Sequence, residues 1–416
     1  MTFTLTKSIL TIKLDSISTL TLALFMLLCG YSLRKKSHLL KRICLPDAVI
    51  GGLLFMVVRM ILHIIGIIEI EMDTTFQSFA MIAFFTCIGL TTNLHKNNNS
   101  ASKLLLKYWG ICAILSLMQN IIGLGAAIAL KIPPVYGVLA GTTTMMGGHG
   151  NGSAFGLTAS NFGFSNGQEI GIACATFGML CGSLLGSPIA KRLIDKYNLT
   201  ALETSEVTVS YFEKGKYNNQ QSGNNKTIAQ LKNLFVVALL MAIGSWLASF
   251  LSSFLKNIVL PEYIGGMFLG LIVRNTLCLK HKQMIDCFAI NDLSNIFLSV
   301  FLSISMVSVK LWQLKDIALS LLIILLLQVV FILLYTKFFV FRFLGKDYDS
   351  AVMCAGLIGH GLGATPNAIA NMDSICDRYG YSNAAMFIVP TVAASLIDLI
   401  MIPTIVLFFN FAVSMS

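Results

Sequence analysis

The chain has 416 residues, of which 56% are hydrophobic and 12% are charged, and its formal net charge is +10. So much apolar surface cannot be hidden in one soluble core, so the composition excludes a soluble protein and indicates a membrane protein with many spans. The lysines and arginines lie between apolar stretches, where they set membrane topology rather than bind nucleic acid.

Apolar runs close to the ~20 residues that a bilayer requires recur along the whole chain. In the first half we predict five spans, at about 17–33, 46–68, 76–93, 106–130 and 170–190. The first run is followed by no small-residue cleavage site, so it is expected to remain a span. In the second half we predict five more, at about 234–255, 262–279, 288–309, 317–341 and 384–411.

Two polar, glycine-rich segments interrupt the two halves at matching places, at about 136–160 and 350–373. Interior glycine costs roughly 1 kcal/mol relative to alanine, so neither segment is expected to form a continuous buried helix. In lipid, broken backbone is tolerated only where protein or a water-filled cavity covers it. We therefore predict that the two segments form the binding site of a secondary transporter.

Broken helices offer free amides, which attract carboxylates, and free carbonyls, which coordinate sodium. Side-chain oxygen and nitrogen groups can complete both sites. The candidates in the two segments are Thr142, Thr143, Thr144, Asn151, Ser153, Thr365, Asn367 and Asn371. The alternative is that these groups only cap the broken helices.

The two halves also repeat one another. LPDAVIGG, from Leu45, precedes Arg59 as LPEYIGG, from Leu260, precedes Arg274, and proline and arginine are 13 residues apart in both. This pair, the segments from Phe84 and Phe301, and the two glycine-rich segments share an offset of about 211 to 217 residues. Five spans per half is an odd number, so the duplication is predicted to be inverted.

Charge predicts the orientation. Cations gather in alternate loops, which the positive-inside rule places in the cytoplasm, with both termini outside. They are Arg34, Lys35, Lys36, Lys41, Arg42, Lys96, Lys103, Lys191, Arg192, Lys280, Lys282, Arg342 and Lys346. The opposite loops are poor in cations, and one carries Glu69, Glu71 and Asp73. The domains are thus a first repeat at 1–197, a polar cytoplasmic linker at 198–230 and a second repeat at 231–416, the linker's alternative being a regulatory module.

Four ionisable residues lie within apolar or glycine-rich surroundings. His149 and His360 have no cysteine or carboxylate within five residues, which argues against a metal site; His149 is either a proton relay or hydrogen-bonding group, or structural. Arg59 either contacts an anion or makes a helix-to-helix salt bridge or snorkels. Asp398 either coordinates an ion or substrate ammonium group, or makes a structural hydrogen bond.

These landmarks together resemble the sodium/glutamate symporter family, over nearly the whole chain from about Asp15 to Phe411. The resemblance rests on LPDAVIGG, on the FF-x-x-IGL segment from Phe84, on GGHGNGSA from Gly147 and on GHGLGATPNAIANM from Gly359. It implies an all-α membrane protein of ten helices, with two inverted five-helix repeats that each carry a re-entrant hairpin. It also implies sodium-coupled uptake of L-glutamate across a bacterial inner membrane by a homodimer, in an elevator-like cycle with a scaffold part and a mobile part.

The family's binding determinants fall at matching positions in the two hairpins. They are Gly147, Gly148, His149, Gly150, Gly361, Gly363, Thr365 and Asn367, and the wider candidate set adds Gly359 and Asp398. A sodium site is expected among Asn151, Thr365, Asn367 and Asp398. The chain has Asn151 where the family more often has threonine, which puts a hydroxyl's role in doubt but keeps an oxygen ligand.

Other functions remain open at this stage. Carriers of other di- or tricarboxylates, coupled to sodium or protons, use similar glycine-rich hairpins, and a channel is a third possibility. An intramembrane enzyme would need a nucleophile with a base or a metal cluster, which neither histidine has nearby. No organic cofactor and no nucleic-acid partner are expected; the predicted partners are glutamate, sodium ions, membrane lipid and a second copy of the chain.

Overall fold

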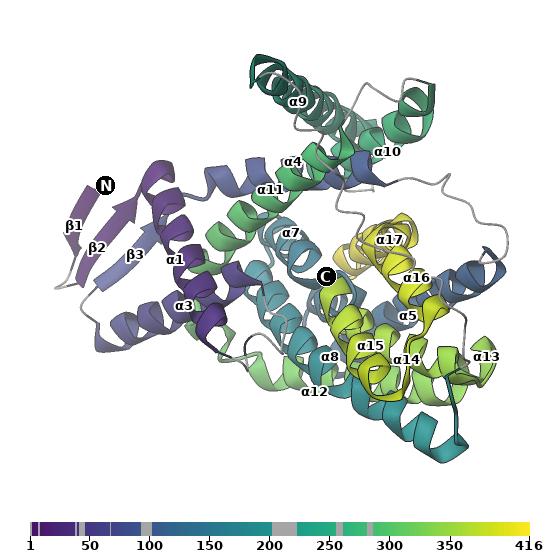
Figure 1. The fold of residues 1–416 in the computed structure, drawn as a ribbon. Helices are drawn as coiled ribbons and strands as arrows, with labels where there is room; N and C mark the ends of the chain where they lie inside the picture. The colour runs from purple at the N-terminus through teal and green to yellow at the C-terminus, as the bar shows by residue number, and fades with distance from the viewer. Residues whose placement is uncertain are drawn as a thin grey trace.

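The computed structural model describes residues 2–6, 9–37, 40, 46–66, 68–92, 102–201, 223–254, 261–280 and 286–416. They form a bundle of helices with one small sheet at its N-terminal end (Figure 1). Seven of the described helices are long and apolar enough to cross a membrane, or eight if a bent pair near the C-terminus is one span. The prediction of a membrane protein with many spans is therefore confirmed.

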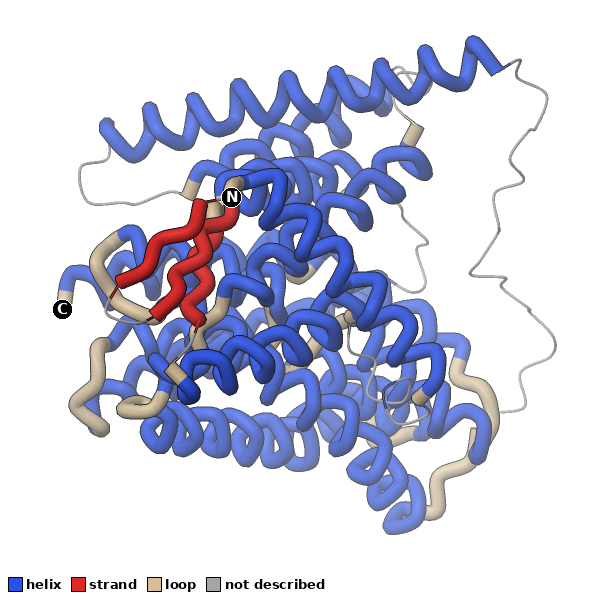
Figure 2. The backbone as a smooth tube through the Cα atoms, turned by 90° about the vertical axis from the view of Figure 1, so that its left-hand side faces the viewer, coloured by secondary structure: helices blue, strands red, loops and turns tan. Residues whose placement is uncertain are grey.

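The small sheet was not predicted and adds to the helical architecture. Strand β1 (Thr2–Thr6) pairs antiparallel with β2 (Ile9–Leu14), which pairs parallel with β3 (Ile68–Met72) (Figure 2). The sequence predicts a loop at Glu69 and Glu71, which lie in β3 instead. The sequence of β3, IEIEM, alternates with the period of a strand, and its Glu71 carboxylate lies 2.9 Å from the amine of Lys13 directly opposite.

Long helices lie at the predicted spans. In the first half they are α1 (Ser16–Lys36), α3 (Asp47–Ile65), α4 (Thr75–Thr91), α5 (Ser102–Ala129) and α8 (Gly167–Tyr197). In the second half they are α9 (Gly223–Phe254), α10 (Glu262–Lys280), α11 (Cys287–Ser308) and α12 (Ala318–Leu334). The 3-10 turn η2 (Leu311–Leu314) precedes α12, which continues through the π-helical stretch η3 (Tyr335–Val340) into α13 (Phe341–Leu344).

The last apolar run is bent rather than straight. It consists of α16 (Asn383–Thr391), the π-helical stretch η4 (Val392–Leu396) and α17 (Asp398–Ser414), and the two helices differ in direction by 42°. Pro390 lies just before the bend, where proline removes a backbone donor and kinks a helix. The bend places Asp398 at the start of α17.

The first glycine-rich segment is broken as predicted. It comprises α6 (Pro134–Val138), the π-helical stretch η1 (Leu139–Thr143) and α7 (Gly148–Asn161). The backbone leaves helical geometry at Gly141, where ψ is −144°, and takes a positive φ of 61° at Gly148. Glycine adopts a positive φ without the strain that a Cβ atom causes, so the sequence permits the break.

The second glycine-rich segment is broken once. Helix α14 (Tyr348–Gly361) ends in glycine, residues 362–364 form the turn, and α15 (Thr365–Tyr379) begins with Pro366 in its first turn. Proline is favoured there because the first-turn amide has no helical partner. At its other end α14 is capped by the Asp347 side chain, which accepts from the Ser350 amide at 2.8 Å.

Helix α8 packs against both broken segments. The backbones of Gly171 in α8 and Gly152 in α7 lie so close that neither position has room for a Cβ atom. Further along α8, a Cβ atom on Gly182 would lie 3.0 Å from the carbonyl oxygen of Gly359 in α14. Small residues at these positions let the helices approach through their backbones, as is common in membranes.

The helices form two groups with most of their contacts inside each group. One group contains α1, α3, α4, α9, α10 and α11; the other contains α5 to α8 and α12 to α17 (Figure 1). Both broken segments belong to the second group. Of the cations used to predict topology, Lys41, Arg42, Lys96 and Lys282 lie outside the described residues, as do residues 202–222 of the predicted linker.

Candidate functional site

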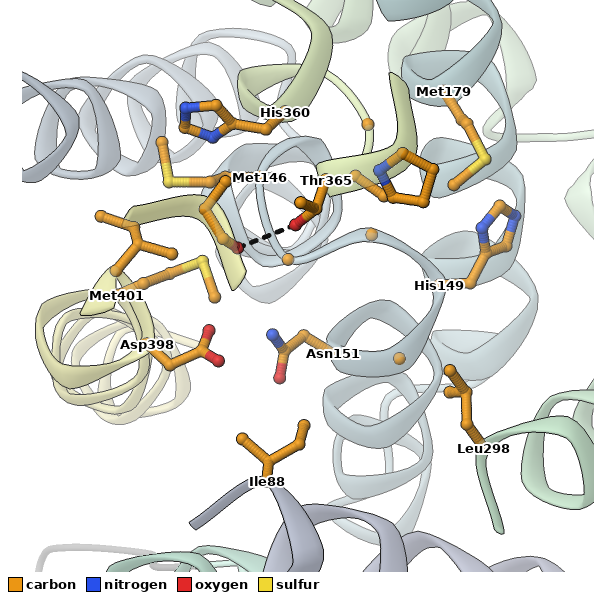
Figure 3. A pocket seen from close by; sticks show the side chains of 18 of the residues that line it. Ile88, Met146, His149, Asn151, Met179, Leu298, His360, Thr365, Asp398 and Met401 are labelled. Atoms are coloured by element: carbon orange, nitrogen blue, oxygen red, sulfur yellow. Dashed lines mark hydrogen bonds between the residues drawn. The ribbon is translucent and has the colours of Figure 1, made fainter. Parts of the chain in front are cut away.

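A cavity of about 250 Å³ lies where the two broken segments meet α4, α11 and the start of α17 (Figure 3). This volume is below the roughly 300–1,000 Å³ of drug-sized sites, so the cavity suits a small solute. The predicted residues that it brings together are Gly147, Gly148, His149, Gly150, Asn151, Gly363, Thr365 and Asp398. Both helix groups contribute to its wall.

The backbones of the two broken segments meet at this cavity. A Cβ atom on Gly148 would lie 3.1 Å from the carbonyl oxygen of Gly363, so the two glycines touch with no side chain between them. Helix α7 begins at Gly148 and α15 begins at Thr365, and both residues line the cavity. The first-turn amides of a helix lack intrahelical acceptors and carry positive partial charge, so this part of the wall favours an anion.

The wall also offers side-chain oxygen atoms. Figure 3 shows the Asp398 carboxylate facing the side-chain amide of Asn151 across the cavity. The Asn151 Oδ1 atom is buried and has no hydrogen-bond partner. Among the described residues Asp398 forms no ion pair with a lysine, arginine or histidine. A carboxylate without an ion pair among the described residues and an unpaired amide oxygen are suited to a cation or an ammonium group.

Thr365 is the third oxygen-bearing residue of the wall. Its hydroxyl donates to the carbonyl of Ala393 in η4 at 3.0 Å, which ties the start of α15 to the bent last span (Figure 3). The hydroxyl oxygen keeps a lone pair for a further contact. The same residue therefore positions the helix end and can contribute to a site.

The two histidines have different environments. The Thr176 hydroxyl donates to the Ile172 carbonyl at 2.8 Å, so it accepts at 2.9 Å from Nε2–H of His149. This leaves Nδ1 of His149 as a buried acceptor without a partner. His360 lines the cavity, but its Nε2 lies 2.9 Å from the hydroxyl of fully buried Tyr108 in α5, which anchors α14.

The remaining predicted residues do not line the cavity. The Asn367 and Asn371 amides donate to carbonyls of α8, at 3.1 Å to Met179 and 2.8 Å to Gly182, and so fix α15 on α8. Asn367 Oδ1 stays buried without a partner. Gly359 packs against the Asn367–Ala368 backbone and so completes the contact between α14 and α15.

The other candidate hydroxyls of the first segment have three different environments. Thr144 donates to the Leu139 carbonyl at 2.7 Å, and Ser153 shares a hydrogen bond with Ser305 of α11. The Thr143 hydroxyl is buried without a partner. Of these three, only the Thr144 hydroxyl satisfies the backbone of the broken segment itself.

Gln119 of α5 joins the two broken segments. Its amide nitrogen donates to the carbonyl of Gly361 at 2.8 Å, and its amide oxygen accepts from the Thr142 hydroxyl at 2.8 Å. The neighbouring Asn120 Oδ1 accepts from the Thr142 amide at 3.2 Å. No local pattern marks Gln119 as a site residue, because a glutamine in an apolar span does not reveal partners 23 and 242 residues away.

The apolar wall of the cavity was also missed. It is formed mainly by Phe84, Phe85 and Ile88 of α4, Leu298 and Leu302 of α11, and Met146, Met179 and Met401. In a chain that is 56% hydrophobic, an apolar side chain at a site carries no distinguishing signal.

Arg59 has a different role from both sequence interpretations. Its guanidinium is buried and donates to backbone carbonyls at the end of α11, at 2.7 Å to Ser308, and to the Ile70 carbonyl of β3 at 2.5 Å. Its carbon Cζ lies 5.4 Å from the ring centroid of Trp312. Arg59 therefore caps α11 and does not line the cavity.

The sequence is similar to known proteins over most of its length. A family model described as sodium/glutamate symporter matches residues 12–381, which include both broken segments. A sodium/glutamate symporter of Haemophilus influenzae is 36% identical over 387 residues, 92% of this chain and 94% of that protein. One of Escherichia coli is 34% identical over 390 residues, 93% of this chain and 95% of that protein.

Proposed function

The chain belongs to the sodium/glutamate symporter family, and we propose that it takes up L-glutamate with sodium through the cavity between its broken segments. It is a transporter and not an enzyme, and sodium is its co-transported ion. The observation that carries the proposal is the meeting of Gly148 and Gly363 at one cavity with the unpaired Oδ1 of Asn151 and the Asp398 carboxylate. Anion-binding amides and cation-binding oxygens there face one small space.

The amide ends of α7 and α15 are the proposed site for the substrate carboxylates. Both helices start at the cavity, and a carboxylate at a helix N-terminus is stabilised by unpaired amides and by the helix dipole. Glycine at 147, 148 and 150 keeps the backbone accessible, because no side chain covers the amides.

The sodium site is proposed among Asn151, Thr365, Asn367 and Asp398. Asn151, Thr365 and Asp398 line the cavity, and Asn367, two residues after Thr365 in α15, has a buried, unpaired Oδ1. Sodium held there would neutralise the Asp398 carboxylate beside an anionic substrate. Glutamate and sodium would then each favour binding of the other, which is the basis of coupling.

For the architecture we propose ten spans in two inverted repeats, at 1–197 and 231–416, joined by a linker at 198–230. Seven apolar helices and one bent pair account for eight spans. The 17-residue apolar helix α4 and the 19-residue α10 would be the other two. The broken segments, at about 136–160 and 350–373, are the proposed re-entrant hairpins.

For the cycle we propose an elevator-like movement in the bacterial inner membrane, with the protein as a homodimer and both termini outside. The two helix groups support the first part, because the broken segments lie together in one group and the cavity lies at its border with the other. The group of α5 to α8 and α12 to α17 would be the mobile part. The group with α4 and α11 would be the scaffold.

Uptake of radiolabelled L-glutamate into proteoliposomes tests the function. An inward sodium gradient should drive accumulation, and a choline gradient of equal strength should not. Competition by citrate or malate as strong as that by glutamate would indicate a carrier of other carboxylates instead. Counterflow of preloaded glutamate that saturates would exclude a channel.

A further inference from the structure

A second cavity, of about 450 Å³, opens on the outer surface of the bundle between α5 and the stretch formed by η3 and α13. Its walls are apolar: Leu106, Ile111 and Ile114 come from α5, and Phe339 and Phe343 come from η3 and α13. Four of the five are exposed, Ile111 being the exception. We call this cavity the α5 groove.

One wall of the α5 groove belongs to an aromatic stack. Phe331, Tyr335, Phe339 and Phe343 follow at four-residue intervals, with successive ring centroids 5.6, 5.3 and 5.5 Å apart. The Tyr335 hydroxyl donates to the Ile111 carbonyl at 2.9 Å, which fixes this stack to α5. This wall is therefore apolar and is held against α5.

The room in the α5 groove depends on a glycine. A Cβ atom on Gly110 would meet no heavy atom within 4 Å, so the space in front of this residue is open. Gly110 lines the groove between Leu106 and Ile114, one turn from each. A large side chain at this position would occupy the space.

One end of the groove is basic. Lys103 and Lys107 line it one helical turn apart, and both side chains are exposed. Among the described residues neither lysine forms an ion pair, and no acidic residue lines the groove. The Lys107 amine lies 5.9 Å from the Phe343 ring centroid, at the point where the charged end meets the apolar wall.

We propose that the α5 groove binds an anionic phospholipid, with its phosphate between Lys103 and Lys107 and an acyl chain along the aromatic stack. An apolar groove that ends in two lysines with no ion pair among the described residues matches the two parts of such a lipid. A zwitterionic lipid would offer the same chain but no net negative charge to the lysines. Each lysine near an anionic headgroup contributes about five-fold in affinity, the factor equivalent to about 1 kcal/mol.

The test is lipid binding to the full-length protein, purified in a neutral detergent and titrated with dioleoyl phosphatidylglycerol or dioleoyl phosphatidylcholine. Native mass spectrometry counts the bound lipids. Wild-type protein should bind at least one phosphatidylglycerol molecule about ten-fold or more tightly than phosphatidylcholine. The variant Lys103→Gln/Lys107→Gln should lose about twenty-five-fold in affinity for phosphatidylglycerol only, and Gly110→Leu should weaken both lipids.

Matched variants separate the groove from general effects. Lys35→Gln/Lys36→Gln removes the same charge at the end of α1, and Gly125→Leu adds the same side chain to open space elsewhere on α5. Both should bind lipid like the wild type, and the elution profile shows whether each variant is folded. Equal affinity of the wild type for the two lipids, or wild-type binding by a folded groove variant, would overturn the proposal.

Discussion

The side-chain amide of Gln328 in α12 donates to the backbone carbonyl of Gln119 in α5 at 2.7 Å, and both side chains are fully buried. The two residues are 209 positions apart, close to the offset between the two halves of the sequence. Helices α5 and α12 therefore meet at corresponding polar positions. Because Gln119 also reaches Thr142 and Gly361, this contact lies behind both breaks in the cavity wall.

Replacement of Gln119 by leucine should destabilise the protein and impair transport. The change leaves the Gly361 carbonyl and the Thr142 hydroxyl buried without their partner, at about 1–3 kcal/mol for each group. The thermal unfolding midpoint measures the loss. Leu117→Ala, on a half-exposed part of the same helix, is the control and should change the midpoint much less. An unchanged midpoint for Gln119→Leu would show that the contact is not maintained in the membrane.

Substitution of Gly148 by alanine should abolish or strongly reduce glutamate binding while protein remains in the membrane. Its φ of 61° costs a residue with a Cβ atom on the order of 1 kcal/mol, and the added methyl group would press on the Gly363 carbonyl. Gly66 has a φ of 73° and open space around it, so Gly66→Ala carries the same strain without the contact. Equal glutamate affinity in the two variants would place Gly148 outside the pathway.

Gly361 should behave differently from Gly148. A Cβ atom there would lie 2.6 Å from Ile332 and 2.9 Å from Leu115, both flexible side chains away from the cavity. Gly361→Leu is thus expected to lower the unfolding midpoint, and the surviving protein should bind glutamate with nearly unchanged affinity. A large loss of affinity at an unchanged midpoint would contradict this division.

The variant Asp398→Asn should lower the affinity for sodium more than the affinity for glutamate. The substitution removes the one negative charge that lines the cavity among the described residues. Binding of labelled glutamate, measured against sodium concentration, should show a several-fold rise in the sodium needed for half-saturation. By linkage, saturating sodium should tighten glutamate by about 5- to 150-fold relative to choline in the wild type. Asp292→Asn, on exposed α11 surface, is the control, and a shift of equal size there would sink the assignment.

Arg59 offers a test between capping and anion binding. Arg59→Met would leave the carbonyls at the end of α11 and that of Ile70 unpaired, so the unfolding midpoint should fall, by about 1–3 kcal/mol in free energy for each group left buried. Arg59→Lys should recover only part of the lost stability, because a lysine amine cannot match the planar fork of donors of the arginine guanidinium. Glutamate affinity should stay near the wild-type value in folded Arg59→Lys. A loss of glutamate affinity in folded Arg59→Lys, without a change in the unfolding midpoint, would support the interpretation that Arg59 contacts an anion.

The positions of the helices could be predicted because an apolar run near the length of a bilayer has few alternatives. The breaks could be predicted from glycine and proline, since Gly148 and Pro366 lie where a new helix begins after each break. The sheet could not, because five or six residues of alternating pattern, as in Ile68–Met72, are weak signals beside a long span.

The candidate site was predictable in part for a similar reason. Gly148, Asn151 and Thr365 stand out as polar or flexible residues within apolar surroundings, and they line the cavity. The burial of Arg59 in a helix cap depends on Ser308, 249 residues away, and no local pattern contains that partner. Asn371 is a second example. From the sequence its side-chain amide could bind solute, but in the structure it donates to the Gly182 carbonyl of α8.

The contact of α8 with both broken segments makes one part of the cavity wall more rigid than the other. Backbone packed on backbone, as at Gly171 and Gly152, has no side-chain torsion that could absorb a shift, so α7, α8 and α14 resist relative displacement. The wall from α4 and α11 consists instead of side chains such as Phe84 and Leu298, which can change rotamer. A solute that leaves the cavity would therefore displace side chains of α4 and α11. The wall formed by α7, α8 and α14 would keep its shape.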